Sequence, residues 1–219
     1  MLRRKTQATQ KNMLVKGVIK IYVIPCFLIF EFSTSTQRPL VLSSTALLKH
    51  NINRFHPENP SRLVECINMI KEVSSLVDYN PPKALEDEEK YNLALSVIKS
   101  IHDINYVNMV KEYCERGQST LSEWDTDTYI CKDTFNQCIL AQSAWLDGVD
   151  YVMKTSNMAF ALSRPPGHHA MKSYSMGFCV FNYAVGAAYY AIEHFNISRV
   201  GIFDFDVVRY SFLNQNDTK

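Results

Sequence analysis

Apolar residues recur at helical spacing in the stretch that follows Asn59. The repeating positions are Leu63, Ile67, Ile70, Val73 and Val77. Because three or four residues separate successive members, their side chains fall on one face of a helix. Asn59 can accept a hydrogen bond from the first turn, and Pro60 suits the first helical position. The pattern predicts a helix from about residue 60, with its apolar face in the core.

The second half of the chain alternates between helix and strand patterns. Helical patterns cover residues 134–153 and 181–195, and short apolar strands are predicted at residues 159–163 and 200–205. A strand, a helix and a strand in this order close by a right-handed crossover into a parallel sheet. We therefore predict an α/β fold, a parallel sheet flanked by helices. Residues 164–170 and 204–206 would meet beyond the carboxyl ends of its strands, where such folds place their sites.

The first 37 residues have a different composition from the remainder. They are basic, contain no acid before Glu31, and hold an apolar run at residues 21–30. Ten apolar residues are too few for a transmembrane helix, and Lys16 and Lys20 precede them. We interpret residues 1–37 as a presequence, with a transit peptide to a mitochondrion or chloroplast favoured over a secretory signal. If they are instead a disordered start, the protein belongs in the cytoplasm or nucleus.

The rest of the chain, residues 38–219, has the size and composition of one domain. The whole chain has 219 residues and is 47% hydrophobic, enough to bury a core. Its net charge of +1 hides an acidic body, because residues 31–219 carry 17 basic and 22 acidic side chains. An acidic body argues against nucleic-acid binding and favours a cationic partner. Six cysteines without a CxxC pair indicate a reducing compartment.

Candidate chemistry gathers in two short motifs. His168 and His169 stand in the segment RPPGHHA, where two prolines and a glycine oppose helix formation. Asp204 and Asp206 alternate in a predicted strand, so their side chains face the same way only if the backbone bends. Paired imidazoles can share acid and base work, and a carboxylate can hold a metal that activates water. The bland alternatives are a hydrogen-bonding surface loop and strand-end turn formation.

Taken together, LSRPPGHHAMKSYSMGFCVFNYAVGAA and VGIFDFDV resemble the zinc-dependent histone deacetylase family, especially its class II and plant organellar-type members. The resemblance extends upstream through HPENPSR, IHDINYV and DTDTY, and covers roughly residues 40–207. It implies the arginase/deacetylase fold and a tunnel that leads an acetylated lysine of a histone or non-histone protein to a buried Zn²⁺. It also implies that this chain corresponds to the N-terminal part of the family's catalytic domain.

The resemblance implies a role for each matching residue. His168 and His169 match the two active-site histidines, Asp204 the carboxylate that orients the first of them, and Asp206 a zinc ligand. Substrate contacts match at Gly177 (a backbone contact), Phe178 (a tunnel wall), Arg62 (an internal acetate channel), and one of Asp125 and Asp127 (the loop aspartate that holds the substrate backbone).

The chain departs from this family after Asp206. The family's next zinc ligand is a histidine, and the matching residue is Val208, which has no lone pair and is followed by Arg209. A third aspartate ligand and a transition-state tyrosine match positions beyond Lys219. Catalytic zinc sites commonly use three protein ligands. We therefore expect a fold incomplete at the C-terminus, a chain that does not retain zinc, and negligible deacetylase activity.

Two alternative functions stay open. The chain could be a noncatalytic module that binds acetyl-lysine or a partner protein, an interpretation that Val208 favours. It could also resemble the related acetylpolyamine amidohydrolases, which would use the same site on a smaller cationic substrate. The sequence leaves the substrate, the acyl-chain preference and the oligomeric state open.

Overall fold

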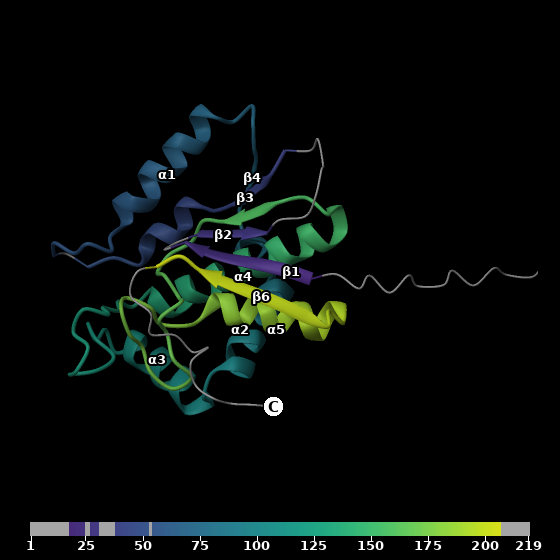
Figure 1. Cartoon of the computed structure of the whole chain (residues 1–219). Coiled ribbons are helices and arrows are strands. Elements are labelled where there is room, and N and C mark those ends of the chain that lie inside the picture. Colours follow the sequence, from purple (N-terminus) through teal and green to yellow (C-terminus); the bar gives the residue numbers. More distant parts are fainter. Residues whose placement is uncertain (1–17, 25–26, 31–37, 53, 207–219) are drawn as a thin grey trace, which may run out of the picture.

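A six-stranded sheet crosses the protein and carries the predicted motifs at one edge (Figure 1). The computed structural model describes residues 18–24, 27–30, 38–52 and 54–206. The strand order is β4-β3-β5-β2-β1-β6. In chain order the strands are β1 (Val18–Ile24), β2 (Phe27–Phe30), β3 (Leu40–Leu42), β4 (Asp78–Asn80), β5 (Ala159–Ala161) and β6 (Arg199–Asp204).

Five of the six strands run in the same direction. β3 pairs in parallel with both β4 and β5, and β1 pairs in parallel with β6. Only β2 is reversed, since its pairings with β1 and β5 are antiparallel. The predicted α/β fold, a parallel sheet flanked by helices, is confirmed, and β2 is its one antiparallel member.

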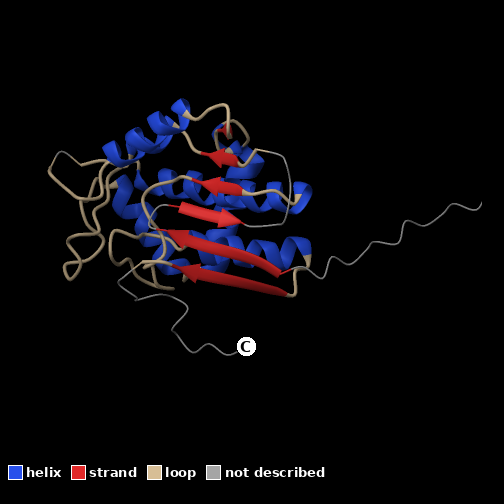
Figure 2. Ribbon diagram, turned by 45° about the horizontal axis from the view of Figure 1, so that its top comes forward, coloured by secondary structure: helices blue, strands red, loops and turns tan. Residues whose placement is uncertain are grey.

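The long helices pack behind the sheet in the view of Figure 2. α4 lies against β3 and β5, α5 lies against β6 and β1, and α2 packs on both helices from outside. Because α4 sits between the sheet and α2, nearly all of its side chains are buried. The helices are η1 (Thr45–Lys49), α1 (Pro60–Glu72), η2 (Lys83–Leu85), α2 (Glu88–Ile101), α3 (Ile104–Glu115), α4 (Thr134–Thr155) and α5 (Tyr183–Phe195).

The predicted elements lie within a few residues of their expected positions. α1 begins at Pro60, and the Asn59 side chain accepts a hydrogen bond from the backbone N–H of Ser61, as predicted. Its first apolar positions, Leu63 and Ile67, are buried, but Val73 is exposed because the helix ends there at the periphery. The strands β5 and β6 are parallel but not adjacent, since β2 and β1 lie between them.

Part of the expected presequence belongs to this sheet. The sequence assigns residues 1–37 to an address segment, and the structure places 18–24 and 27–30 of them as the hairpin β1–β2. Ile21 in β1 is fully buried. The remaining residues of this segment lie outside the described ranges. Among the described helices, we find none with the length and apolar character needed to cross a membrane.

Candidate active site

The histidine loop follows β5 and leads into α5. Pro165, Pro166 and Gly167 precede His168 and His169, and both imidazoles are buried. Their ring centroids are 4.0 Å apart, with the ring planes tilted by 33°. The local sequence therefore places two imidazoles side by side at the carboxyl end of a strand.

The carboxylates of β6 face these imidazoles. Asp204 accepts a hydrogen bond from Nδ1 of His168, with 3.0 Å between Nδ1 and Oδ2. Oδ2 of Asp206 lies 3.4 Å from Nε2 of His168 and 3.1 Å from Nε2 of His169. Both aspartates reach the same side because the strand ends at Asp204, where the backbone N–H of Asp206 donates to the Asp204 carboxylate. The predicted meeting of the imidazole pair with Asp206 is confirmed.

Burial keeps His168 predominantly neutral. Desolvation lowers its pKa, the neighbouring His169 lowers it further, and Asp204 and Asp206 partly oppose these effects. Because a carboxylate only accepts hydrogen bonds, Nδ1 of His168 carries the proton that faces Asp204. The lone pair of the neutral ring is then on Nε2, on the side of Asp206. His168 is thus arranged to accept a proton there.

Ligand atoms from His168, His169 and Asp206 all lie within 4.8 Å of one another. Two imidazole nitrogens and a carboxylate oxygen form a donor set that divalent zinc accepts. Asp204 holds the outer nitrogen of His168, the arrangement that commonly orients a metal-bound histidine. The next expected ligand position, Val208, and its neighbour Arg209 lie outside the described residues.

Gly177 and Phe178 form a tight turn against His169. The backbone groups of Met176 and Cys179 bond across it, and both central residues have positive φ, +56° at Gly177 and +69° at Phe178. A Cβ atom at Gly177 would lie 2.7 Å from Cδ2 of His169. The close approach of the imidazole excludes a side chain at this position, and the positive φ adds a preference for glycine. Of the two predicted substrate residues, Gly177 borders His169, and Phe178 follows it in the same turn.

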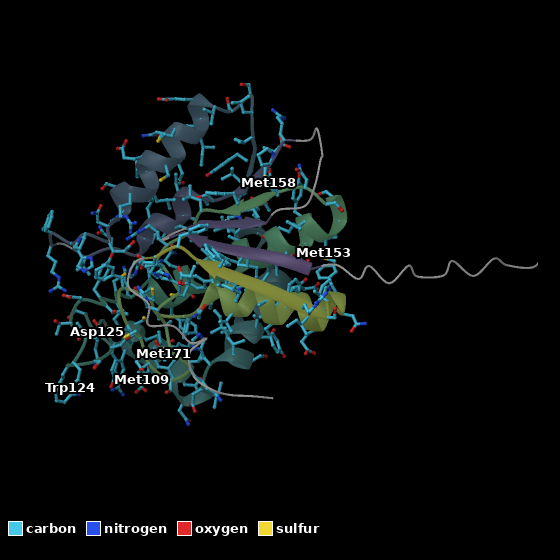
Figure 3. All side chains as sticks on the ribbon, viewed as in Figure 1. Met109, Trp124, Asp125, Met153, Met158 and Met171 are labelled. Atoms are coloured by element: carbon cyan, nitrogen blue, oxygen red, sulfur yellow. The ribbon has the colours of Figure 1, made fainter. Side chains whose placement is uncertain are left out.

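The loop that contains Asp125 and Asp127 meets this turn through Thr128. The Thr128 hydroxyl accepts the N–H of Phe178 at 2.9 Å and donates to the Asp125 carboxylate at 2.5 Å. Asp127 is exposed, and its backbone carbonyl lies 3.0 Å from Nε2 of His56. Figure 3 shows Asp125 and Trp124 on this loop, beyond the carboxyl ends of β1 and β6. Asp125 is thus the predicted aspartate that is tied to the Phe178 turn.

Arg62 lies apart from the histidine pair. It lines a cavity of about 190 Å³ together with Glu58, Cys66 and Arg164. The cavity lies beneath the start of the histidine loop, because Arg164 is the residue that opens this loop. Arg62 is itself exposed, so its expected place in an internal acetate channel stays a prediction.

Two supporting residues beneath the histidine loop were not singled out from the sequence. The Asn182 side chain caps α5 and donates to the carbonyls of His168 and Ala170 at 3.3 and 3.2 Å. Nε2 of His102 accepts the Asn182 N–H, while Nδ1 faces the carbonyl of Met171. Desolvation by burial lowers the pKa of His102 to about 4, so the ring is neutral and Nε2 accepts this hydrogen bond. His102 stands in the motif IHDINYV, which was the only signal of its role.

A second support is the buried pair of Glu58 and Arg164. The two side chains are only 1% and 2% exposed and form two parallel hydrogen bonds of 2.8 Å. Both residues stand in motifs noted above, HPENPSR and RPPGHHA, but their contact joins positions far apart in sequence. No local pattern could have identified them as a pair.

Comparisons with known proteins agree with this geometry. A family model described as histone deacetylase domain matches residues 56–208. The chain is 33% identical over 177 residues to "Histone deacetylase 14, chloroplastic" of Arabidopsis thaliana, an alignment that covers 77% of this chain and 42% of that protein. It is 37% identical over 110 residues to "Polyamine deacetylase HDAC10" of Danio rerio, covering 48% of this chain and 16% of that protein.

A solved structure shares the fold. The HDA15 HD domain superposes with a TM-score of 0.56 at 23% identity, over 71% of this chain and 44% of that chain. The chain spans about half the length of the first curated relatives it matches.

Proposed function

Because the chain belongs to the histone deacetylase family, we propose that its site recognises the acetylated lysine of a histone or non-histone protein. One observation carries the proposal. His168, His169, Asp204 and Asp206 converge beside the turn of Gly177 and Phe178. These residues match the histidine pair, the carboxylates and the substrate turn of the family's active site. The acidic body of the chain suits a cationic protein substrate.

Each residue of the constellation has a proposed task. Asp204 holds His168 with its lone pair on Nε2, ready to take a proton from an attacking water. His169, whose Nε2 hydrogen-bonds to Asp206, would return a proton to the leaving amine. The ring of Phe178 would line the tunnel along the lysine methylenes, Gly177 would contact the substrate backbone, and Asp125 rather than exposed Asp127 would hold the peptide. Arg62, at the cavity that it shares with Glu58 and Arg164, would occupy the position of the family's acetate-channel arginine.

The zinc site of the family is not fully supplied by this chain. The resemblance assigns His168 and His169 to proton transfer and not to zinc, so among these residues only Asp206 matches a family ligand. The sequence has Val208 where the family has a histidine ligand, and Val208 offers no donor atom. We infer that zinc is not retained in the family's geometry and that hydrolysis by this chain is negligible. No step of the reaction is therefore derived through a metal.

Two alternatives use the same site differently. A noncatalytic acetyl-lysine reader is favoured by Val208, because recognition through Asp125, Gly177 and Phe178 needs no metal. A smaller acetylated polyamine is suggested by the relative named as a polyamine deacetylase. Both alternatives keep a cationic acetylated ligand, and they differ from the first proposal in chemistry and in ligand size.

The cellular setting is also proposed. Residues 38–219, together with the β1–β2 hairpin that completes the sheet, would form the N-terminal portion of a deacetylase-type domain, and the basic residues at the start of the chain would direct the protein to an organelle. The chloroplastic relatives support a plastid over a mitochondrion. The cytoplasm and the nucleus are the alternatives.

The test measures binding and hydrolysis separately. A fluorescent acetyl-lysine peptide is titrated with the full chain, and its deacetylation is followed with and without added zinc. We expect saturable binding that acetylated but not unmodified peptide competes away, and no zinc-dependent product. Tighter competition by N-acetylspermidine than by acetyl-lysine peptide would support the polyamine alternative. Zinc-dependent hydrolysis that His169→Ala abolishes would contradict the proposed inactivity.

A further inference from the structure

The pair of Glu58 and Arg164 joins segments that are remote in sequence. Besides the two bonds to Glu58, Arg164 donates through Nη1 to the carbonyl of His50 at 2.7 Å and through Nη2 to the hydroxyl of Tyr129 at 3.0 Å. Tyr129 in turn donates to Oε2 of Glu58 at 2.9 Å. We call these four residues the arginine hub. They bring together the end of η1, the segment before α1, the loop before α4, and the first residue of the histidine loop.

The arginine hub contains one positive and one negative charge. Desolvation by burial lowers the pKa of His50 well below its usual range, and Arg164 lowers it further, so His50 adds no second cation. Burial, and then Glu58, raise the pKa of Tyr129, so its hydroxyl stays protonated and can donate. His50 stacks on the Tyr129 ring at 4.3 Å, with the ring planes 6° apart. Every charge in the hub is thus paired, as burial demands.

Residues of the arginine hub are close in sequence to residues of the proposed site or to their direct contacts. On one side, Arg164 is followed by two prolines and then, four positions on, by His168. On the other, Tyr129 follows Thr128, whose hydroxyl holds both the Phe178 N–H and Asp125. A third contact supports the same link, because the ring of His56, two residues before Glu58, lies edge-on against Phe178 at 4.9 Å.

We propose that the Glu58–Arg164 pair is a positioning unit that sets the substrate turn of Gly177 and Phe178 against the histidine loop. The inference rests on the proposed function for its substrate. The planar guanidinium fixes the direction of its bonds to Glu58, His50 and Tyr129 at once. A lysine can supply the charge but not this geometry, and a pair of apolar side chains can fill the space but supplies neither.

Four variants separate positioning from simple stability. Arg164→Lys keeps the charge and removes the fork, and the double variant Glu58→Met with Arg164→Met removes both charges at similar volume. Glu58→Gln leaves Arg164 unpaired. Val149→Ala is the matched control, since Val149 is fully buried in α4, about 20 Å along the helix from Thr134 near the hub.

Three measurements are made on each full-chain variant: the melting temperature, the hydrogen exchange of the Phe178 amide, and the dissociation constant for the acetyl-lysine peptide. We expect Arg164→Lys to speed Phe178 exchange and weaken peptide binding at least tenfold each. The double variant should regain most of the melting temperature, because no buried charge is left unpaired, while both other readouts stay as in Arg164→Lys. Val149→Ala should lower the melting temperature alone.

Two results would overturn the inference. One is a double variant that restores Phe178 exchange together with stability, which would make the pair a structural filler. The other is a Phe178 amide that stays protected in Arg164→Lys. If the parent chain binds no acetylated peptide, the proposed function fails, and Phe178 exchange still decides whether the hub positions the turn.

Discussion

The two sides of the candidate site are held in different ways. The histidine side is buried, with 7% of the His168 side chain and 11% of the His169 side chain exposed. Side-chain hydrogen bonds from Asn182 and the arginine hub support it from beneath. The carboxylate side is more open, with 23% of the Asp204 side chain and 25% of the Asp206 side chain exposed. Among the described strands, its carrier β6 pairs only with β1.

The comparison separates contacts that the residues of a motif make themselves from support that comes from another part of the chain. The histidine side is supported by residues of the family's motifs, whose side chains make specific hydrogen bonds. The carboxylate side depends on the backbone pairing of β6 with β1. Loss of β1 should therefore dismantle the site from the carboxylate side and leave the histidine loop in place.

The largest effect is expected from Ile21→Asp, which breaks the support of β6. Ile21 is fully buried, and a carboxylate without a partner in that position should lower the free energy of unfolding by more than about 4 kcal/mol. Urea denaturation measures this loss, and hydrogen exchange should show β6 opening before the histidine loop. Ile21→Val is the control and should cost only about 1 kcal/mol. Equal stability of Ile21→Asp and the parent chain would show that the hairpin does not support β6.

Acid should weaken the histidine side next. The folded pKa of His102 is about 4, below its usual 6.5, so between these values the unfolded chain binds a proton that the folded chain refuses. The free energy of unfolding should therefore fall as the pH drops from about 6.5 to about 4, by up to about 3 kcal/mol from this residue. His102→Gln should flatten this part of the stability profile, measured by urea titration at each pH. An unchanged profile in the variant would assign the acid sensitivity to other groups.

A smaller effect is expected where the substrate turn touches the histidine side. Gly177→Ala places a Cβ against the His169 ring and a side chain at positive φ. We expect a loss of about 2 kcal/mol in stability and at least tenfold weaker binding of the acetyl-lysine peptide. Gly117→Ala is a useful control, since that glycine also has positive φ but has open space around its Cβ. Comparable loss of binding in both variants would mean that the contact with His169 is unimportant.

Asp204→Asn, on the carboxylate side, should have the smallest effect on stability. The Asp204 side chain is 23% exposed, so solvent screens part of its interaction with His168, and asparagine can keep a hydrogen bond there; we expect a loss of about 1 kcal/mol. Because the Asp204 charge raises the pKa of His168, its removal should lower that pKa further, as nuclear magnetic resonance titration of the imidazole would show. A rise in the His168 pKa would contradict the assigned contact.

Local signals accounted for α1, α4 and α5, but not for α2, α3 or the full sheet. The start of α1 was predictable because Asn59 and Pro60 act within one turn of the helix. The strands β1 and β2 were not, because an apolar run flanked by Lys16 and Lys20 is equally typical of a presequence. Strand pairing is decided by partners distant in the chain, and these partners are β5 and β6. The strand order of a sheet therefore cannot be predicted from a short window of sequence.

The same limit applies to the site. His168, His169, Asp204 and Asp206 were predictable because they stand in two compact motifs at strand ends. The family resemblance supplied roles for Gly177 and Phe178, but the turn that they form is seen only in the structure. Arg164 and Glu58 both stand in motifs that the sequence analysis quoted. Their hydrogen bonds, however, join positions more than a hundred residues apart, so their contact is seen only in the folded chain.

The pairing of β1 with β6 also sets the order of events during synthesis. The first described strand leaves the ribosome long before its parallel partner, whose register begins with Val18 opposite Arg199. The β1–β2 hairpin therefore stays without β6 beside β1 until nearly all of the described chain has been translated. Pairings between segments so distant in sequence form slowly. A protease that removed the leader near residue 37 in this interval would take both strands with it. Cleavage of the leader and pairing of β1 with β6 would then compete in the newly made chain.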